Sequence, residues 1–436
     1  MTNWISRTSL VRLASAAVLF ISLHVLLPET ATAQCGGLCL YEVGTPDSGR
    51  SAAGAGARAQ DASTAYWNPA GMTELEGTHI LVGSVFGFVD TEYDGGAFLD
   101  DGGGGNAAGT DEGGRIGTLI PLGSGFVSLA VWEKLRFGFA LNALYGGEAD
   151  YDNDWVGRTF VTEASLGALN LQPTLAYPIT DWFSLGAGVS VVYTWMDLSL
   201  RAGPALGSLA PPTAPAATIK VNDANDWGAA AIVSALVKWG DHTRFGFLYR
   251  SETELTLKGD VQGTPIAGID FAGEMVFAQG INLSVAHVLN YTVTLYADAG
   301  WTDWSEFSDQ AWTFSGDLRG STLDIDRDWK DTWRLGVGAE WQVMEKLMLQ
   351  GGFSYDSSPV KDSKRYPDIP VGEAYRFSVG QRFTPVEHVE MFASYTGLWS
   401  GDPDLDGVVL PDGTVMNGKY KPSWIHFVSM GISINF

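Results

Sequence analysis

The last thirteen residues, Trp424 to Phe436, constrain the fold of this chain more than any other stretch. Every second residue from Trp424 onward is large and mostly apolar, and the residues between them become small and polar toward Phe436. A period of two with one apolar face predicts a strand that is buried on one side. A last strand that ends on an aromatic residue is typical of bacterial outer-membrane β-barrels, but a strand of an ordinary β-sandwich shows the same alternation.

The first 33 residues have the pattern of a secretory signal peptide. Arg7 and Arg12 are positively charged, residues 13–27 form an apolar core, and residues 31–33 (Ala-Thr-Ala) form a small-x-small cleavage site. We therefore expect residues 1–33 to be removed after export.

The composition of the remaining chain favours a membrane β-barrel. No stretch approaches the roughly 20 consecutive apolar residues that a membrane-spanning helix requires. Yet 45% of the residues are hydrophobic, and the chain contains 16 Trp and 54 Gly. A closed barrel satisfies every backbone hydrogen bond inside lipid without such a helix. Composition alone leaves a large secreted all-β protein open as the alternative.

The connections between the alternating stretches also alternate in length. The short polar turns lie near residues 132–134, 180–182, 240–242, 289–291, 344–346 and 385–388. The longer links, rich in Gly, Pro and Asp, lie near residues 90–124, 146–159, 201–220, 257–270, 303–325, 356–373 and 399–422. Short periplasmic turns and long outer loops are the asymmetry of outer-membrane barrels. The pattern predicts an all-β fold, a fourteen-stranded antiparallel transmembrane barrel with both termini in the periplasm.

The first strand is predicted to begin near His79, which divides the mature chain into two parts. Residues 34–76 are alanine-rich and predict short helices, and residues 77–436 form the barrel. Cys35 and Cys39 are close in sequence, so a disulfide between them is plausible in the oxidising periplasm. We expect no metal and no cofactor, because two cysteines without further ligands cannot complete a tetrahedral shell. The net charge of −24 argues against a nucleic-acid partner.

Several charged residues alternate with the apolar face of the predicted strands. A charge that faced lipid near the midplane would cost about 2–4 kcal/mol, so these side chains are predicted to face the barrel interior. We expect most of them to pair with one another and to brace the wall. They are Arg244, Arg250, Asp298, Arg334, Glu340, Arg376, Arg382 and Glu390.

The run from Ala62 to Gly71, Ala-Ser-Thr-Ala-Tyr-Trp-Asn-Pro-Ala-Gly, resembles the signature of the FadL/TodX family of outer-membrane transporters for hydrophobic compounds. Further matches lie at residues 155–158, 170–177 and 183–188, so the resemblance covers essentially the whole mature chain. It implies a monomeric barrel plugged by an N-terminal helical hatch. The hatch and gating residues that the resemblance assigns are Asn68, Pro69, Ala70 and Gly71.

The resemblance also implies a route for the transported molecule. A ligand would bind among the outer loops, reach a deeper pocket, and leave sideways through a gap made by a kinked third strand. We place this strand at about residues 134–146, where Gly146 and Gly147 either distort its outer end or open the following loop. Arg201 resembles a position where the family offers a cation to a carboxylate.

The function predicted from these observations is passive, ligand-gated uptake of long-chain fatty acids or aromatic hydrocarbons across the outer membrane of a Gram-negative bacterium. The partners would be the hydrophobic substrate, outer-membrane lipid and lipopolysaccharide. A porin with an open polar channel is one alternative. An outer-membrane enzyme that acts on lipids is another, but no catalytic motif surrounds any histidine, so we predict that the protein is not an enzyme.

Overall fold

The computed structural model describes residue 38 and residues 40–99, 115–116, 119–202, 217–263, 268–315, 321–410 and 413–436. The predicted signal peptide, Cys35 and Cys39 lie outside these residues. Within the described part of the chain, four short helices come first, and the strands follow with two further short helices between them.

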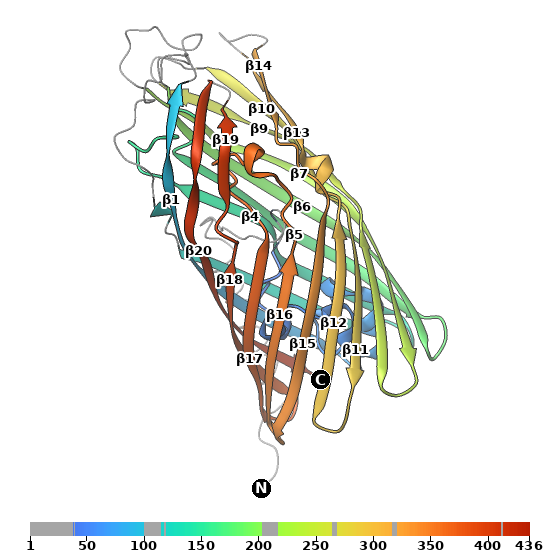
Figure 1. Cartoon of the computed structure of the whole chain (residues 1–436). Coiled ribbons are helices and arrows are strands. Elements are labelled where there is room, and N and C mark those ends of the chain that lie inside the picture. The colour runs from blue at the N-terminus through green and yellow to red at the C-terminus, as the bar shows by residue number, and fades with distance from the viewer. Residues whose placement is uncertain are drawn as a thin grey trace.

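Fourteen strands form the wall, and each pairs antiparallel with the next (Figure 1). The last strand pairs with the first, so the wall is closed and leaves no free sheet edge there. The predicted fourteen-stranded barrel is confirmed. Its strands are β1 (His79–Leu99), β3 (Leu119–Ala130), β4 (Arg136–Asp150), β5 (Glu163–Pro178), β6 (Phe183–Ala202), β7 (Ala217–Trp239), β8 (Thr243–Arg250), β11 (Gly280–Val288), β12 (Val293–Thr302), β15 (Thr332–Met344), β16 (Leu347–Asp356), β17 (Ala374–Val386), β18 (Val389–Trp399) and β20 (Thr414–Asn435).

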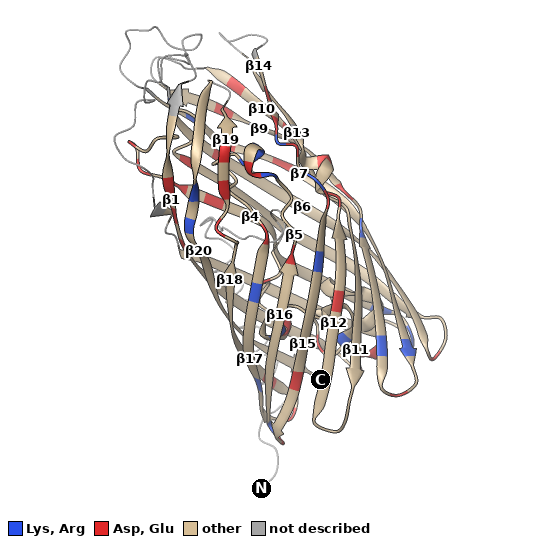
Figure 2. Ribbon diagram, in the orientation of Figure 1, with Lys and Arg blue, Asp and Glu red and all other residues tan. Residues whose placement is uncertain are grey.

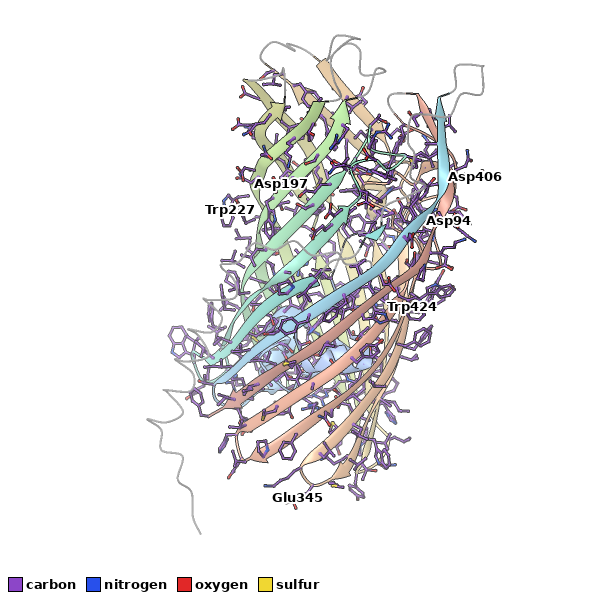
Figure 3. The ribbon with its side chains drawn as sticks, turned by 90° about the vertical axis from the view of Figure 1, so that its left-hand side faces the viewer. Asp94, Asp197, Trp227, Glu345, Asp406 and Trp424 are labelled. Carbon is purple, nitrogen blue, oxygen red and sulfur yellow. The ribbon has the colours of Figure 1, made fainter. Side chains whose placement is uncertain are left out.

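The period of two in the sequence appears as alternating exposure along each strand. On β15 the outward side chains of Trp333, Leu335 and Val337 are 61%, 59% and 57% exposed, whereas Arg334 between them is 3% exposed. Lipid would cover the apolar face, and the polar face lines the interior. Figure 3 shows β1 beside β20 where the barrel closes, with Trp424 about midway along the wall and Glu345 at the end with the short turns.

The outer links are more ordered than the sequence predicts. Strands run into the stretches that we expected to be loops, and additional strands extend the wall beyond the membrane. These additional strands are β2 (Arg115–Ile116), β9 (Thr253–Gly263), β10 (Ile269–Phe277), β13 (Asp309–Phe314), β14 (Ser321–Asp326) and β19 (Asp404–Val409). Figure 2 shows many acidic residues at this end of the barrel. Buried and exposed residues do alternate along β9 and β10, but the Gly, Pro and Asp residues in and around these strands led us to expect loops.

The described helices are short: η1 (Pro46–Arg50), α2 (Ala55–Arg58), α3 (Thr64–Trp67), η2 (Pro69–Glu74), η4 (Trp304–Phe307) and η6 (Asp362–Lys364). None of them is long and apolar enough to cross a membrane.

Candidate functional site: hatch, cavities and wall seam

The segment formed by residue 38 and residues 40–76, which we call the hatch, lies inside the barrel, near the end with the short turns (Figure 1). Its helices are short because the backbone reverses between them. Ser51, Ala52 and Ala59 adopt positive φ angles of 52°, 58° and 48°, which end a right-handed helix. The helices pack around the inner wall, with η1 against β17 and β18, α2 against β8 and β11, and η2 against β5 and β6.

The family-like motif fixes the hatch to the wall through Asn68. Its Nδ2 donates to the carbonyl of Gly56 at 2.6 Å within the hatch and to the carbonyl of Ala235 on β7 at 3.0 Å. The next contact follows two residues later, where the backbone N–H of Ala70 donates to Ser234 Oγ at 3.0 Å. Asn68 is 1% exposed, so these bonds form away from water. The residue therefore joins two parts of the hatch to one strand of the wall.

Small residues in this region allow the hatch backbone to touch the wall. A Cβ at Gly186 on β6 would overlap the Ala70 nitrogen, and a Cβ at Gly246 on β8 would overlap the Gly56 carbonyl. Within the motif itself, a Cβ at Gly71 would come within 2.8 Å of the Thr64 side chain. A larger residue at Gly186 or Gly246 would push the hatch away from the wall, and a larger residue at Gly71 would crowd the hatch itself.

A single wall carboxylate, Glu340 on β15, faces three arginines at the centre of the barrel. Its Oε1 lies 3.2 Å from Arg50 Nε, 3.5 Å from Arg58 Nε and 3.3 Å from Arg382 Nη1. Arg50 and Arg58 belong to the hatch, whereas Arg382 belongs to β17. Glu340 is 1% exposed, so this ion pairing takes place in a low-dielectric interior where it is strong.

Two hatch aspartates complete this network. Asp47 pairs with Arg50 and lies 3.7 Å from Arg58, and Asp61 pairs with Arg58 at 2.5 Å. These carboxylates offset the positive charge that the arginines bring into the barrel. The hatch is therefore bound by charges of its own as well as by charges of the wall.

A second ion-pair cluster lies on β12, β15, β16 and β17. Asp356 lies 3.2 Å from Arg334 Nη1 and 2.5 Å from Arg376 Nη1. Arg334 also contacts Asp298 at 3.1 Å, and Arg376 contacts Glu42 of the hatch at 3.1 Å. The wall charges predicted to face inward therefore do so at these positions, and part of their pairing is with the hatch.

The wall has a seam between β3 and β4. The two strands pair only from Gly125 with Leu141 to Ala130 with Arg136, and beyond Gly125 the strand β3 pairs with β1 alone among the described strands. On the other side, β4 stays paired with β5 up to Asp150, with a register shift between Ala143 and Tyr145. The pairing of β3 with β4 is thus complete toward the short turn that joins them and absent toward their outer ends.

The N-terminal residues of the hatch occupy the unpaired edge of β4. The N–H of Leu40 donates to the carbonyl of Leu144 at 3.0 Å, and the N–H of Gly146 donates to the carbonyl of Leu38 at 3.1 Å. Gly146 and Gly147 therefore lie inside β4, opposite Gly167 and Leu166 of β5, and do not open the following loop. The hatch replaces the strand neighbour that β4 lacks there.

An outer cavity of about 70 Å³ lies next to the seam. Val89, Thr91 and Ile116 line it from β1 and β2, and Gly147 and Glu148 line it from β4. Most of the other lining side chains are apolar and come from neighbouring strands, from the hatch and from the loop before β17: Leu38, Ala164, Leu166, Met196, Leu198, Met275, Trp312, Ile369, Val371 and Ile425.

The polar end of the outer cavity contains a buried ion pair. Arg327, which follows β14, donates from Nη1 to Asp368 Oδ1 at 3.0 Å and from Nη2 to Asp368 Oδ2 at 2.5 Å. Its Nε donates to Gln310 Oε1 on β13 at 3.2 Å. All three residues line the cavity.

An inner cavity of about 120 Å³ lies beside the hatch and is rich in aromatic side chains, including Tyr66 and Trp67 of α3. Arg250 lines it and donates from Nη2 to Gln172 Oε1 at 2.9 Å. Gln172 Nε2 in turn donates to the carbonyl of Ala65 in α3 at 2.9 Å. Arg250 takes part in no ion pair among the described residues, and its Nη1 has no hydrogen-bond partner there.

Arg201 lies at the outer end of β6, apart from both cavity linings. Its Nε donates to Asn153 Oδ1 at 3.2 Å in the link that follows β4. The cations that do line the cavities are Arg250 and Arg327. Arg250 was among the inward charges predicted from the alternation, but Arg327 was missed because it follows a short strand inside a predicted loop.

No group of three or more His, Cys, Asp or Glu side chains is arranged to hold a metal ion in the part of the chain that the structure describes.

Known proteins resemble this chain along most of its length. The family described as "Outer membrane protein transport protein (OMPP1/FadL/TodX)" matches residues 26–408. Outer membrane protein P1 of Haemophilus influenzae is 23% identical over 399 residues, which cover 82% of this chain and 84% of that protein. The long-chain fatty acid transport protein of Escherichia coli K12 is 23% identical over 402 residues, which cover 80% of this chain and 84% of that protein.

Solved structures share the fold. A Pseudomonas aeruginosa FadL homologue aligns with a TM-score of 0.82 and 24% identity, over 92% of this chain and all of that one. The toluene transporter TodX of P. putida aligns with a TM-score of 0.66 and 17% identity, over 86% and 94% of the two chains. The predicted outer-membrane location is confirmed by the family match and by the names of the relatives. The chain therefore belongs to the OMPP1/FadL/TodX family, the outer-membrane transporters of hydrophobic compounds.

Proposed function

We propose that this protein carries out passive, ligand-gated uptake of hydrophobic small molecules across the outer membrane. The cargo enters the outer cavity, reaches the inner cavity beside the hatch, and leaves sideways through the seam between β3 and β4. Binding of the cargo shifts the hatch between two arrangements, and one of these arrangements opens the seam.

The seam is the observation that carries this proposal. The outer cavity lies next to it, lined by Gly147 on β4 and by Ile116 on β2, which pairs with β1. The unpaired edge of β4 is held by Leu38 and Leu40 of the hatch and not by β3. A movement of this hatch segment would therefore uncover the edge without breaking any hydrogen bond between two wall strands.

Lateral exit also suits the physics of the cargo. A hydrophobic molecule gains about 25 cal/mol per Å² of apolar area when it leaves water for a dry cavity. The polar surface of lipopolysaccharide and a water-filled pore offer no such gain. An exit through the wall delivers the molecule to the apolar interior of the same membrane, where it keeps this free energy.

A larger side chain at Gly147 tests the route. Gly147 lines the outer cavity, and a Cβ there would lie 3.6 Å from Leu38, so Gly147→Leu should fill the cavity. We expect uptake of labelled fatty acid and of labelled toluene to fall to the level of cells that lack the protein. The matched control is Gly96→Leu, at an exposed position on β1 where a Cβ would meet nothing within 4 Å. Normal uptake by Gly147→Leu cells, with normal amounts of folded protein, would contradict the route.

Long-chain fatty acids and aromatic hydrocarbons are the two cargo classes, and Arg250 can distinguish them. A guanidinium without a carboxylate partner can pair with the head group of a fatty acid but offers little to toluene. For a fatty-acid carrier, Arg250→Met should abolish saturable fatty-acid uptake, and Arg250→Lys should retain part of it. Arg201→Met is measured in parallel. If only this variant lost fatty-acid uptake, the carboxylate-binding residue would be Arg201, at the outer end of β6, and not Arg250.

A further inference from the structure

The outer cavity contains a hydrogen-bond donor that no described group of the protein uses. Gln310 on β13 is 3% exposed and lines the cavity. Its Oε1 accepts from Arg327 Nε at 3.2 Å, whereas its Nε2 has no partner in the described structure. A buried donor without an acceptor costs about 1–3 kcal/mol, so an acceptor from a ligand or from water would stabilise it.

The direction of this amide follows from the chemistry of its neighbour. A guanidinium only donates, so the amide oxygen of Gln310 must face Arg327 and the NH₂ group must face away from it. This orientation holds even though the oxygen and nitrogen of an amide look alike in most structures. Arg327 therefore fixes the position in which Gln310 presents its donor.

The charges around the outer cavity disfavour a carboxylate at this position. The positive charge of Arg327 is neutralised by its two contacts with Asp368, at 3.0 and 2.5 Å. Glu148 and Asp197 also line the cavity, so the lining contains one guanidinium and three carboxylates. A further carboxylate would be repelled in this poorly hydrated space, whereas an uncharged oxygen would not.

We propose that the outer cavity is a subsite for uncharged hydrophobic compounds that carry one accepting oxygen, either a carbonyl or a hydroxyl. This oxygen accepts from Gln310 Nε2, and the apolar part packs against Met196, Met275 and Trp312. The inference relies on the proposed function for the route, and it adds a cargo class to fatty acids and hydrocarbons. The two cavities then differ in chemistry, because Gln310 offers a neutral donor and Arg250 offers a cation.

The test measures binding to the purified full-length protein in lipid nanodiscs. Labelled 2-decanone, decane and decanoate are compared by equilibrium dialysis, with empty nanodiscs to correct for partition into lipid. Gln310→Glu keeps the acceptor for Arg327 but replaces the NH₂ group by an oxygen, and Gln310→Met removes both polar groups. We expect both variants to lower the affinity for 2-decanone by about threefold to tenfold, the size of one neutral hydrogen bond, relative to decane.

The matched control is Gln279→Met. The amide of Gln279 is satisfied within the protein, because it accepts from the Tyr249 hydroxyl at 2.9 Å and donates to Asp303 at 3.1 Å, and it does not line the outer cavity. This variant should keep the preference of the wild type for 2-decanone over decane.

Two results would overturn the inference. One is equal affinity of the wild type for 2-decanone and decane, which would mean that only water uses the Gln310 donor. The other is a larger loss of decanoate than of 2-decanone binding in Gln310→Met, which adds no charge to the cavity. Either result, combined with normal fatty-acid uptake by cells, leaves the proposed uptake intact. Absence of uptake of every cargo by wild-type cells would instead remove the proposed function.

Discussion

At the scale of single residues, the hatch is held by polar side chains that meet across long stretches of sequence. Glu340 of the wall lies near Arg50 and Arg58 of the hatch, all of them buried. Removal of one partner from a buried ion pair leaves an uncompensated charge and typically costs 3–5 kcal/mol. The hatch is therefore held firmly, and a ligand must supply a substantial differential interaction to move it.

Asn68→Ala should loosen this hold without leaving an unpaired charge. The variant removes the donor to Gly56 and Ala235 and should destabilise the docked hatch by about 1–3 kcal/mol. We expect faster hydrogen exchange in residues 55–72 and loss of ligand-dependent uptake, because the hatch no longer has one defined resting arrangement. Asn417→Ala, at an exposed position on β20, is the control. Unchanged exchange in the hatch would contradict this role of Asn68.

The sequence predicted the residue-scale features only in part. The motif at Asn68 could be recognised because its residues are contiguous in the sequence. The inward charges could be recognised because they alternate with apolar residues. The partners of these charges were not predictable, since Arg50 and Glu340 are separated by 290 residues in the chain. Gln310 was also hidden, because its six-residue strand lies inside a segment without membrane-like alternation.

At the scale of elements, the loop around η6 is clasped to the end of β14 by three ion pairs. Asp326 pairs with Lys364 at 2.7 Å, and Asp328 pairs with Lys361 at 2.7 Å. The third pair is buried and joins Asp368 to Arg327, which lies between Asp326 and Asp328 in the sequence. The clasp thus holds residues 361–371, part of which line the outer cavity.

The double variant Lys361→Met/Lys364→Met should loosen the loop without unfolding the barrel. The two pairs are partly exposed and worth at most about 1 kcal/mol each, so we expect up to about fivefold faster hydrogen exchange in residues 357–373 per pair. High salt should have the same effect in the wild type and little effect in the variant. Lys346→Met in the β15–β16 turn is the control. Identical exchange in all three proteins would show that the clasp does not restrain the loop.

The pH dependence of the clasp follows from Asp326. The hydrogen bond from Lys364 lowers the pKa of the Asp326 carboxyl. A carboxyl with a lowered pKa stabilises the folded arrangement above its unfolded pKa, and the stabilisation is lost as the pH falls through the lowered value. Exchange in this loop should therefore be insensitive to protonation of Asp326 between pH 6 and 8, and faster in strong acid.

The strand count was predictable at this scale, but the strand lengths were not. The six short turns allowed the strands of the wall to be counted, because the periplasmic ends of these strands lie just outside the lipid. The outer ends were placed too early, as β4 shows: it continues through Gly146 and Gly147 to Asp150. Glycine there gives no apolar signal, and the hydrogen bonds that extend the strand come from β5 and from the hatch.

At the scale of the whole molecule, a closed wall surrounds an interior that the hatch crosses near the periplasmic end (Figure 1). The fold alone does not decide between a transporter and a porin, but the filled interior gives them different electrical behaviour. We expect purified full-length protein in planar lipid bilayers to show no steady porin-like current. A general porin under the same conditions is the control, and a stable conductance step with each inserted molecule would favour the porin alternative.

In the proposed route, the hatch must move for the cargo to pass. Ser51 beside η1 and Ser378 on β17 have their hydroxyl oxygens 2.8 Å apart, so Ser51→Cys/Ser378→Cys places two sulfurs within bonding reach. The most direct measurement is fatty-acid and toluene uptake by cells with this double variant, before and after reduction, with Ser378→Cys alone as the control. We predict that the disulfide blocks uptake and that reduction restores it. Equal uptake with the disulfide formed, as verified by mass spectrometry, would contradict it.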